Sequence, residues 1–151
     1  MYVNAAINFF LYKNFGWGIY YKYFRTSGTM NVYGTNIISK IHSNFIGLSL
    51  LYKARLSNFM NYELIASPGI LLYRDKLETA YDKAKISGEV FGLNVNNRFG
   101  LAKKHGVGVF LEISYLYCIL NSWYVEDVMA SNTDHLNISR IEIGIGLTWM
   151  K

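Results

Sequence analysis

The stretch from Arg140 to Trp149 reads RIEIGIGLTW, and two kinds of residue alternate along it. Its odd positions carry only apolar side chains, which are Ile141, Ile143, Ile145, Leu147 and Trp149. Its even positions carry Arg140, Glu142, Gly144, Gly146 and Thr148. Because successive side chains of a β-strand point to opposite faces, this stretch predicts a strand with one wholly apolar face.

The same alternation recurs in six earlier segments, which are residues 3–11, 17–24, 46–55, 62–73, 91–99 and 107–119. The segment 62–73 has the weakest contrast, and its Pro68 cannot donate a ladder hydrogen bond, which predicts a bulge or a weak edge there. Short connections (13–16, 56–59, 101–105) alternate with long polar ones (26–43, 75–86, 121–137). We therefore expect an all-β fold made of an antiparallel up-and-down meander, with a helical turn at most in 75–85.

Composition excludes several classes of protein. The 151 residues suffice for one domain, and 52% are apolar while only 17% are charged, which excludes a disordered chain. A single cysteine, Cys118, excludes a disulfide scaffold, and we expect it to be a small packed residue. No apolar run approaches the roughly 20 residues of a membrane helix. The +5 charge is scattered, so we expect no nucleic-acid partner.

Two all-β architectures fit the alternation, and they place the apolar face on opposite sides. A soluble lipocalin-like barrel turns it inward, whereas a transmembrane barrel turns it toward lipid. The less apolar face consists largely of Gly, Asn, Ser and aromatic residues, which suits a narrow filled lumen better than a surface in water. Aromatic residues also gather near both strand ends, as in the two interfacial belts of a spanning barrel. We expect one belt at Tyr12, Phe15, Trp17, Phe59, Tyr62, Phe99 and Trp149, and the other at Tyr21, Tyr23, Phe45, Tyr73, Tyr117 and Trp123.

The charges within the strands share the inward parity. They are Lys22, Lys53, Arg55, Glu63, Arg98, Glu112, Arg140 and Glu142. Because a charge that faces lipid is costly, we interpret these residues as a lumen network in which Glu112 pairs with Arg140 or Arg98. A structural plug and a path for an ion or substrate are both compatible with this network.

Two passages carry a family resemblance. Residues 8–18, NFFLYKNFGWG, resemble the periplasmic hairpin of the small outer-membrane β-barrel family of the OmpA-like or OmpX-like type. Asn97 to Gly100, together with Gly106 to Gly108, resemble the same kind of hairpin. The last strand resembles the barrel-assembly signal at Glu142, Gly144, Leu147 and Trp149, although the chain ends in Met-Lys. The resemblance implies a bacterial outer-membrane location, with contacts to outer-membrane lipid, to the barrel-assembly machinery and to an unknown extracellular partner through the long loops.

Bacterial barrels of one chain have an even number of strands, and seven are visible here. We therefore expect residues 1–151 to form one β-barrel domain that lacks an eighth, N-terminal strand and a signal peptide. An unclosed edge leaves backbone groups unsatisfied in lipid, so these residues alone are expected to insert poorly.

Some members of the resembled family modify lipid A, so a Ser, His and acid group was sought. His42 and Ser43 are adjacent, and adjacent strand residues point to opposite faces. His105 and His135 lie in connections, and no metal spacing is present. We expect a non-enzymatic barrel without metal or cofactor; a lipid-modifying enzyme and a soluble lipocalin-like binder remain the alternatives.

Overall fold

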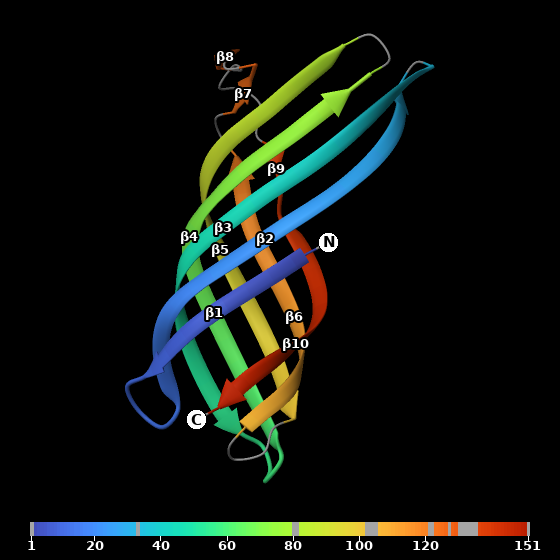
Figure 1. Cartoon of the computed structure of the whole chain (residues 1–151). Helices are drawn as coiled ribbons and strands as arrows, with labels where there is room; N and C mark the ends of the chain where they lie inside the picture. The colour runs from blue at the N-terminus through green and yellow to red at the C-terminus, as the bar shows by residue number, and fades with distance from the viewer. Residues whose placement is uncertain are drawn as a thin grey trace.

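In the computed structural model, one antiparallel sheet curls into a half-barrel (Figure 1). The structure describes residues 2–32, 34–79, 82–101, 106–120, 123–126, 128–129 and 136–150. The strands are β1 (Tyr2–Phe10), β2 (Phe15–Val32), β3 (Thr35–Arg55), β4 (Met60–Glu78), β5 (Lys83–Leu101), β6 (Gly106–Leu120), β7 (Tyr124–Val125), β8 (Val128–Met129), β9 (Leu136–Asn137) and β10 (Arg140–Met150).

The main path of the sheet follows the chain, in the order β1-β2-β3-β4-β5-β6-β10. Every neighbouring pair on this path is antiparallel. The predicted all-β, up-and-down arrangement of seven main strands is therefore confirmed. The edge strands β1 and β10 each pair with one main neighbour, and they run in the same direction.

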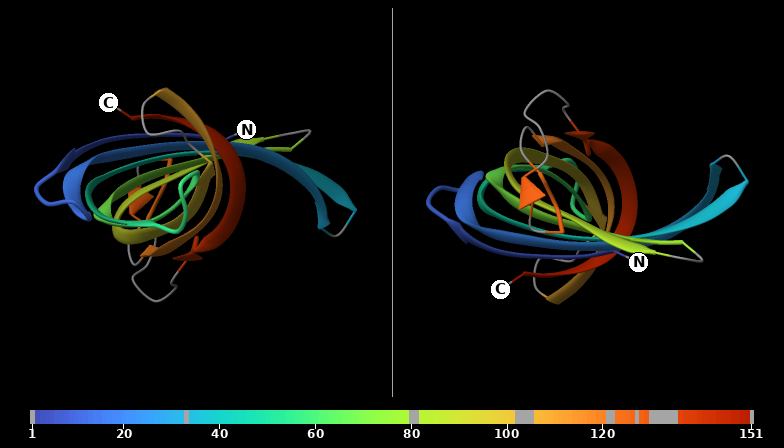
Figure 2. Two further views of the ribbon diagram at one scale, coloured as in Figure 1. Left: turned by 90° about the horizontal axis from the view of Figure 1, so that it is seen from below. Right: turned by 90° about the horizontal axis from the view of Figure 1, so that it is seen from above.

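Two of the three connections predicted to be long loops are strands. The β2–β3 ladder continues from Thr26 opposite Ile41 as far as Val32 opposite Thr35. The β4–β5 ladder continues from Asp75 opposite Ile86 to Glu78 opposite Lys83, so the helical turn expected in 75–85 is wrong. In these segments the outward side chains change from apolar to polar, so the sequence no longer alternates between apolar and polar residues. The backbone ladder continues nevertheless. Figure 2 shows both hairpins extending beyond the curled sheet.

Pro68 causes no shift of register. Ile46 opposite Ile70 and Leu50 opposite Ala66 belong to the same pairing frame, and the β3–β4 ladder is interrupted only between them. Pro68 also lies inside the sheet, opposite Leu93 of β5. The predicted bulge or weak edge is therefore wrong: the missing N–H opens a gap in one ladder of a central strand.

The apolar face of the sheet points outward. On β10, Ile143 is 71% and Ile145 80% exposed. The opposite face of the sheet points inward, where Tyr20 of β2, Ile65 of β4 and Asn96 of β5 are fully buried. This arrangement is the reverse of a lipocalin-like interior, and it confirms the expected assignment of the two faces. Among the described residues, the structure contains no helix that is long and apolar enough to cross a membrane.

The two predicted aromatic belts, one at each end of the strands, agree with the structure to different degrees. At the short-turn end, Phe15, Trp17 and Phe59 are 57%, 46% and 61% exposed. Cross-strand ring pairs reinforce this belt, because the ring centroids of Phe15–Tyr52 and Tyr62–Phe99 lie 5.1 Å apart. At the other end, Phe45 and Tyr73 are buried on the inward face, so their assignment to a belt is wrong. The side chain of Trp149 lies outside the described residues.

Candidate functional site

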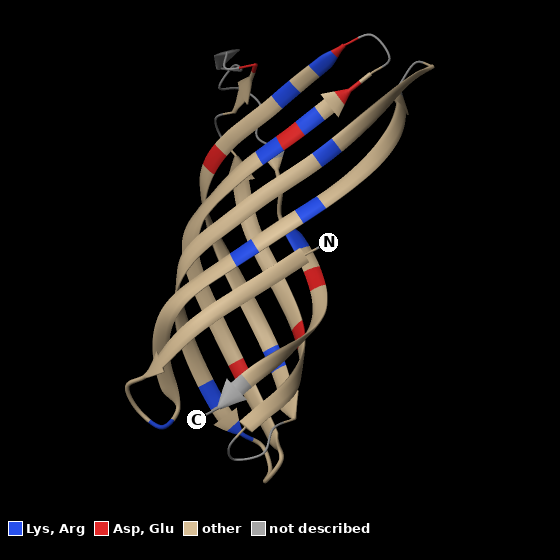
Figure 3. Cartoon of the chain, viewed as in Figure 1, with Lys and Arg blue, Asp and Glu red and all other residues tan. Residues whose placement is uncertain are grey.

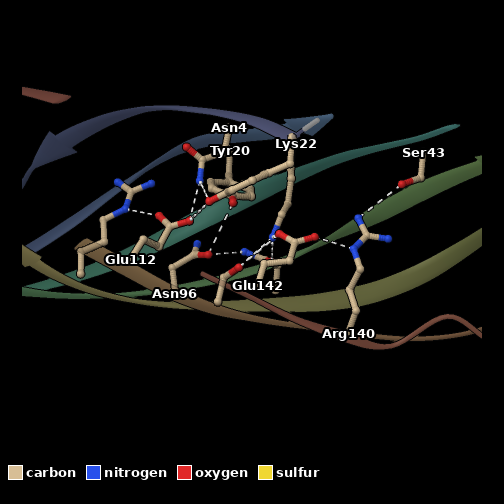
Figure 4. A network of polar contacts seen from close by, with 12 residues as sticks. Asn4, Tyr20, Lys22, Ser43, Asn96, Glu112, Arg140 and Glu142 are labelled. Atoms are coloured by element: carbon tan, nitrogen blue, oxygen red, sulfur yellow. Dashed lines mark hydrogen bonds and ion pairs between the residues drawn. The ribbon is translucent and has the colours of Figure 1, made fainter. Parts of the chain in front are cut away.

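Glu112 is the centre of one polar cluster in the lumen, which we define as the space enclosed by the inward face of the curled sheet. Its inward parity on β6 leaves it fully buried. Arg98 Nε donates to Glu112 Oε2 at 2.5 Å. Tyr2 Oη and Asn4 Nδ2, both from β1, donate to Oε1 at 2.9 and 2.5 Å. The carboxylate therefore joins the edge strand β1 to β5 and β6 across the lumen (Figure 4).

Lys22 is the centre of a second cluster. Its Nζ lies 2.5 Å from Glu142 Oε2 on β10. The same ammonium donates to Asn94 Oδ1 at 3.1 Å and to Ser114 Oγ at 2.9 Å. All three of its donors thus have acceptors, as a buried ammonium requires. Because these acceptors come from β5, β6 and β10, the cluster ties β2 to the opposite side of the half-barrel.

Arg140 belongs to the same cluster through Glu142. Its Nε donates to Glu142 Oε1 at 2.5 Å, and its guanidinium carbon lies 3.9 Å from the ring centroid of Phe24. The predicted pairing of Glu112 with Arg98 is confirmed, whereas the alternative with Arg140 is wrong. In the β6–β10 register, Arg140 lies opposite Leu116, and Glu112 lies opposite Gly144, which is two inward positions further along β10.

The short-turn end holds a third pair, because Lys53 and Glu63 lie opposite each other on β3 and β4. Their Nζ and Oε1 are 2.9 Å apart, and both side chains are more than four-fifths buried, at 18% and 16% exposure. Arg55, which was predicted to join the network, is instead exposed and donates to the backbone oxygen of Ser57 and to the Asn58 side chain. The alternation of faces ends where the turn begins, so parity did not place Arg55 in the lumen.

Bulky side chains fill the lumen at the level of the Lys22 cluster, since Lys22 lies opposite Phe45 and Arg140 lies opposite Leu116. Tyr20 and Phe45 are fully buried with ring centroids 6.2 Å apart, and they form one cluster with Leu71, Leu116 and Cys118. Beside the Phe45 ring, Gly47, Gly69 and Gly92 lie side by side in register on β3, β4 and β5. A Cβ at Gly47 would lie 2.5 Å from the backbone oxygen of Pro68 and 3.1 Å from the Phe45 ring. This glycine row, which was not predicted from the sequence, therefore leaves space for the backbone of the neighbouring strand as well as for the Phe45 ring of the aromatic plug; Cys118 is packed there as expected.

Below the Glu112 cluster the lumen is hollow. A cavity of about 430 Å³ lies between β1, the end of β10 and the opposite wall. Its polar lining includes Asn4, Asn8, Lys53, Glu63 and Arg98. The cavity therefore contains paired charges at the short-turn end and is separated from the long-hairpin end by the aromatic plug.

The charges also have neutral partners in the lumen that were not predicted from the sequence. Asn94, Asn96 and Ser114 are buried on the inward face, and Asn94 donates to Asn96 at 3.0 Å. Tyr20 Oη also reaches Asn96 Oδ1 at 3.5 Å. Their inward parity and small polar side chains were a usable signal, because buried ions need neutral acceptors as well as counter-ions.

His42 and Ser43 point to opposite faces of β3 and make no hydrogen bond with each other. His42 lies on the outward parity of β3, with Nδ1 3.2 Å from Tyr23 Oη. Ser43 is buried on the inward parity, with Oγ 3.4 Å from Arg140. His105 and His135 lie outside the described residues. No group of three metal-ligating side chains occurs in the part of the chain that the structure describes.

The residues of the assembly-signal pattern occupy both faces of β10. Glu142 joins the Lys22 cluster, and a Cβ at Gly144 would collide with the Tyr2 ring. Leu147 points outward and is 73% exposed.

No protein-family model, curated protein or solved structure matches this chain. The resemblance to the OmpA-like or OmpX-like family therefore stays a prediction.

Proposed function

We propose that this chain is the barrel domain of a bacterial outer-membrane protein whose outer surface contacts lipid. The observation that carries the proposal is the distribution of side chains between the two faces. Apolar residues such as Leu48 (63% exposed) and Ile143 (71% exposed) cover the outside. The charges at the same level of the strands are buried inside and paired.

Water is a poor solvent for such an exterior. Soluble monomers rarely expose contiguous apolar patches larger than a few hundred Å². Here exposed apolar side chains continue from β1 through β6 to β10, on every strand of the main path. Hydrocarbon, in contrast, accepts apolar side chains and excludes charges, which matches both faces.

The lumen contents favour a structural role over conduction. Each of the four described lumen cations has a carboxylate partner: Lys22 and Arg140 with Glu142, Lys53 with Glu63 and Arg98 with Glu112. The plug of Tyr20 and Phe45 lies between the cavity and the long hairpins. We infer a non-catalytic, non-conducting barrel whose β2–β3 and β4–β5 hairpins meet partners outside the cell, and whose β10 is recognised by the barrel-assembly machinery.

The test uses the complete product of the gene. Cells that express it are fractionated, and the membrane fraction is run on a denaturing gel with and without boiling. We expect recovery in the outer membrane and a band whose migration changes on boiling, because a closed barrel resists detergent until it is heated. A product that remains in the soluble fraction, with identical migration in both samples, would refute the proposal.

A further inference from the structure

Cations lie side by side on the outward face of the β2–β3 and β4–β5 hairpins. One cross-strand row consists of Arg25, His42, Arg74 and Ser87, in register on β2, β3, β4 and β5. The next row toward the hairpin ends consists of Ser27, Lys40, Lys76 and Lys85. We name these two rows the cationic band, and Figure 3 shows Lys and Arg on all four of these strands.

The described carboxylates within the hairpins neutralise the cationic band only in part. Lys40 pairs with Glu78 at 2.6 Å. Among the described residues, Arg74, Lys76 and Lys85 have no carboxylate within ion-pair distance, although Glu89 faces outward one row below Arg74. Like charges placed directly opposite on neighbouring strands destabilise a sheet. Lys76 opposite Lys85 is therefore an arrangement that an external anion would stabilise.

One mixed row separates the band from the apolar exterior, and it consists of Tyr23, Asn44, Leu72 and the exposed Glu89. Two rows toward the short turns, Tyr21, Ile46, Ile70 and Phe91 are 38%, 52%, 53% and 71% exposed. A hollow of about 490 Å³ adjoins the band, and its lining includes Arg74, Lys85, Ser87, Glu89 and Tyr124. Basic and hydroxyl groups two rows from an apolar surface match an amphiphile with an anionic head and hydrocarbon tails.

We propose that the cationic band binds the phosphate headgroups of anionic lipids whose acyl chains lie against the apolar exterior. This inference rests on the proposed membrane location and adds a lipid class to it. A free phosphate shares the headgroup chemistry, but it gains nothing from the apolar rows below the band, so the lipid is the better fit.

The experiment compares two double variants of the full gene product. K76Q/K85Q removes the two cations that lie opposite each other. K13Q/R55Q is the matched control, because it removes two exposed cations at the short-turn end. Each protein is reconstituted into pure phosphatidylcholine vesicles and into mixed vesicles of phosphatidylcholine and phosphatidic acid. After extraction in mild detergent, the phospholipids that co-purify with the protein are quantified by mass spectrometry.

We expect the unmodified protein and the control to enrich phosphatidic acid over phosphatidylcholine. The enrichment in K76Q/K85Q should fall by about fivefold per removed charge, and the K76R/K85R variant should retain it. Equal enrichment in both double variants would overturn the lipid site. Release of phosphatidic acid by an equal concentration of inorganic phosphate would also overturn it, in favour of a site for soluble anions.

Insertion into pure phosphatidylcholine vesicles separates the two proposals. A protein that inserts there but shows no enrichment refutes the lipid site alone. A protein that enters neither kind of vesicle refutes the proposed membrane location, and the lipid site with it.

Discussion

The lumen and the cationic band are built from the same alternating strands, yet their charges are arranged in opposite ways. In the lumen, Arg98 faces Glu112 and Lys22 faces Glu142, each at 2.5 Å. In the band, Lys76 lies opposite Lys85, and both side chains are exposed. Buried ions must be neutralised within the protein because desolvation is costly, whereas exposed ones leave their field available to a partner. The lumen charges are therefore satisfied within the protein, whereas the charges of the hairpins face outward.

Removing a lumen carboxylate should cause the largest effect. Glu112→Gln leaves Arg98 buried beside a neutral amide, and breaking a buried pair costs about 3–5 kcal/mol of unfolding free energy. Denaturant unfolding of the refolded protein in detergent measures this loss. The control is Glu63→Gln, because the side chains of Lys53 and Glu63 are 18% and 16% exposed, against 9% and 1% for Arg98 and Glu112. If both variants lost the same stability, burial would not set the cost of breaking a lumen pair.

A charge placed on the apolar exterior tests the medium around it. Leu48 lies in the middle of the outward apolar rows of β3, so Leu48→Lys should cost about 2–4 kcal/mol in a bilayer. On a surface in water the same change should stay within about 0.5 kcal/mol. Thr29→Lys, on the exposed outer side of the β2–β3 hairpin, is the matched control. Equally small effects in vesicle-reconstituted protein would mean that water covers both regions.

Two glycines allow a smaller test of the difference in packing between the lumen and the hairpins. A Cβ at Gly92 would collide with the Cys118 side chain and approach Phe45 at 3.6 Å. Gly92→Ala should therefore lower stability by about 1–3 kcal/mol through overpacking. Gly28, in the hairpin, has no atom within 4 Å of such a Cβ. Gly28→Ala should raise stability by about 0.5–1 kcal/mol through lower chain entropy. If Gly92→Ala raised the thermal unfolding temperature as Gly28→Ala does, the plug would not be close-packed.

The smallest effect concerns the exposed pair at the hairpin end. The hydrogen bond from Lys40 holds the pKa of Glu78 below its ordinary value of 4.5. Because the pKa of Glu78 is lower in the folded protein, its ionised form stabilises the hairpin at any pH above the ordinary pKa of 4.5. That stabilisation is lost as the pH falls through the lowered pKa. Lys40→Gln should move the carboxyl titration of Glu78, followed by NMR, back toward 4.5, while Lys13→Gln leaves it unchanged. An unaltered titration in Lys40→Gln would show that the pair does not set this pKa.

The main strands and their faces were predictable because side-chain alternation is local. The strand that contains Ile141, Ile143 and Ile145 was predicted from its own residues, as were the outward face of β6 and the inward position of Lys22. Predictions were wrong where the outward face became polar, at Thr26 and Asp75, because alternation then shows no contrast although the ladder continues.

By itself, the sequence determined an antiparallel β-meander with an apolar face and a polar, charge-bearing face. Only the tertiary structure decided that Glu112 binds Arg98 and Tyr2, that Glu142 holds both Lys22 and Arg140, and that lysines meet on the hairpins. The physical reason is the range of the interactions. Side-chain parity follows from one strand alone, whereas the choice of partners depends on the register of several strands and on how far the sheet curls.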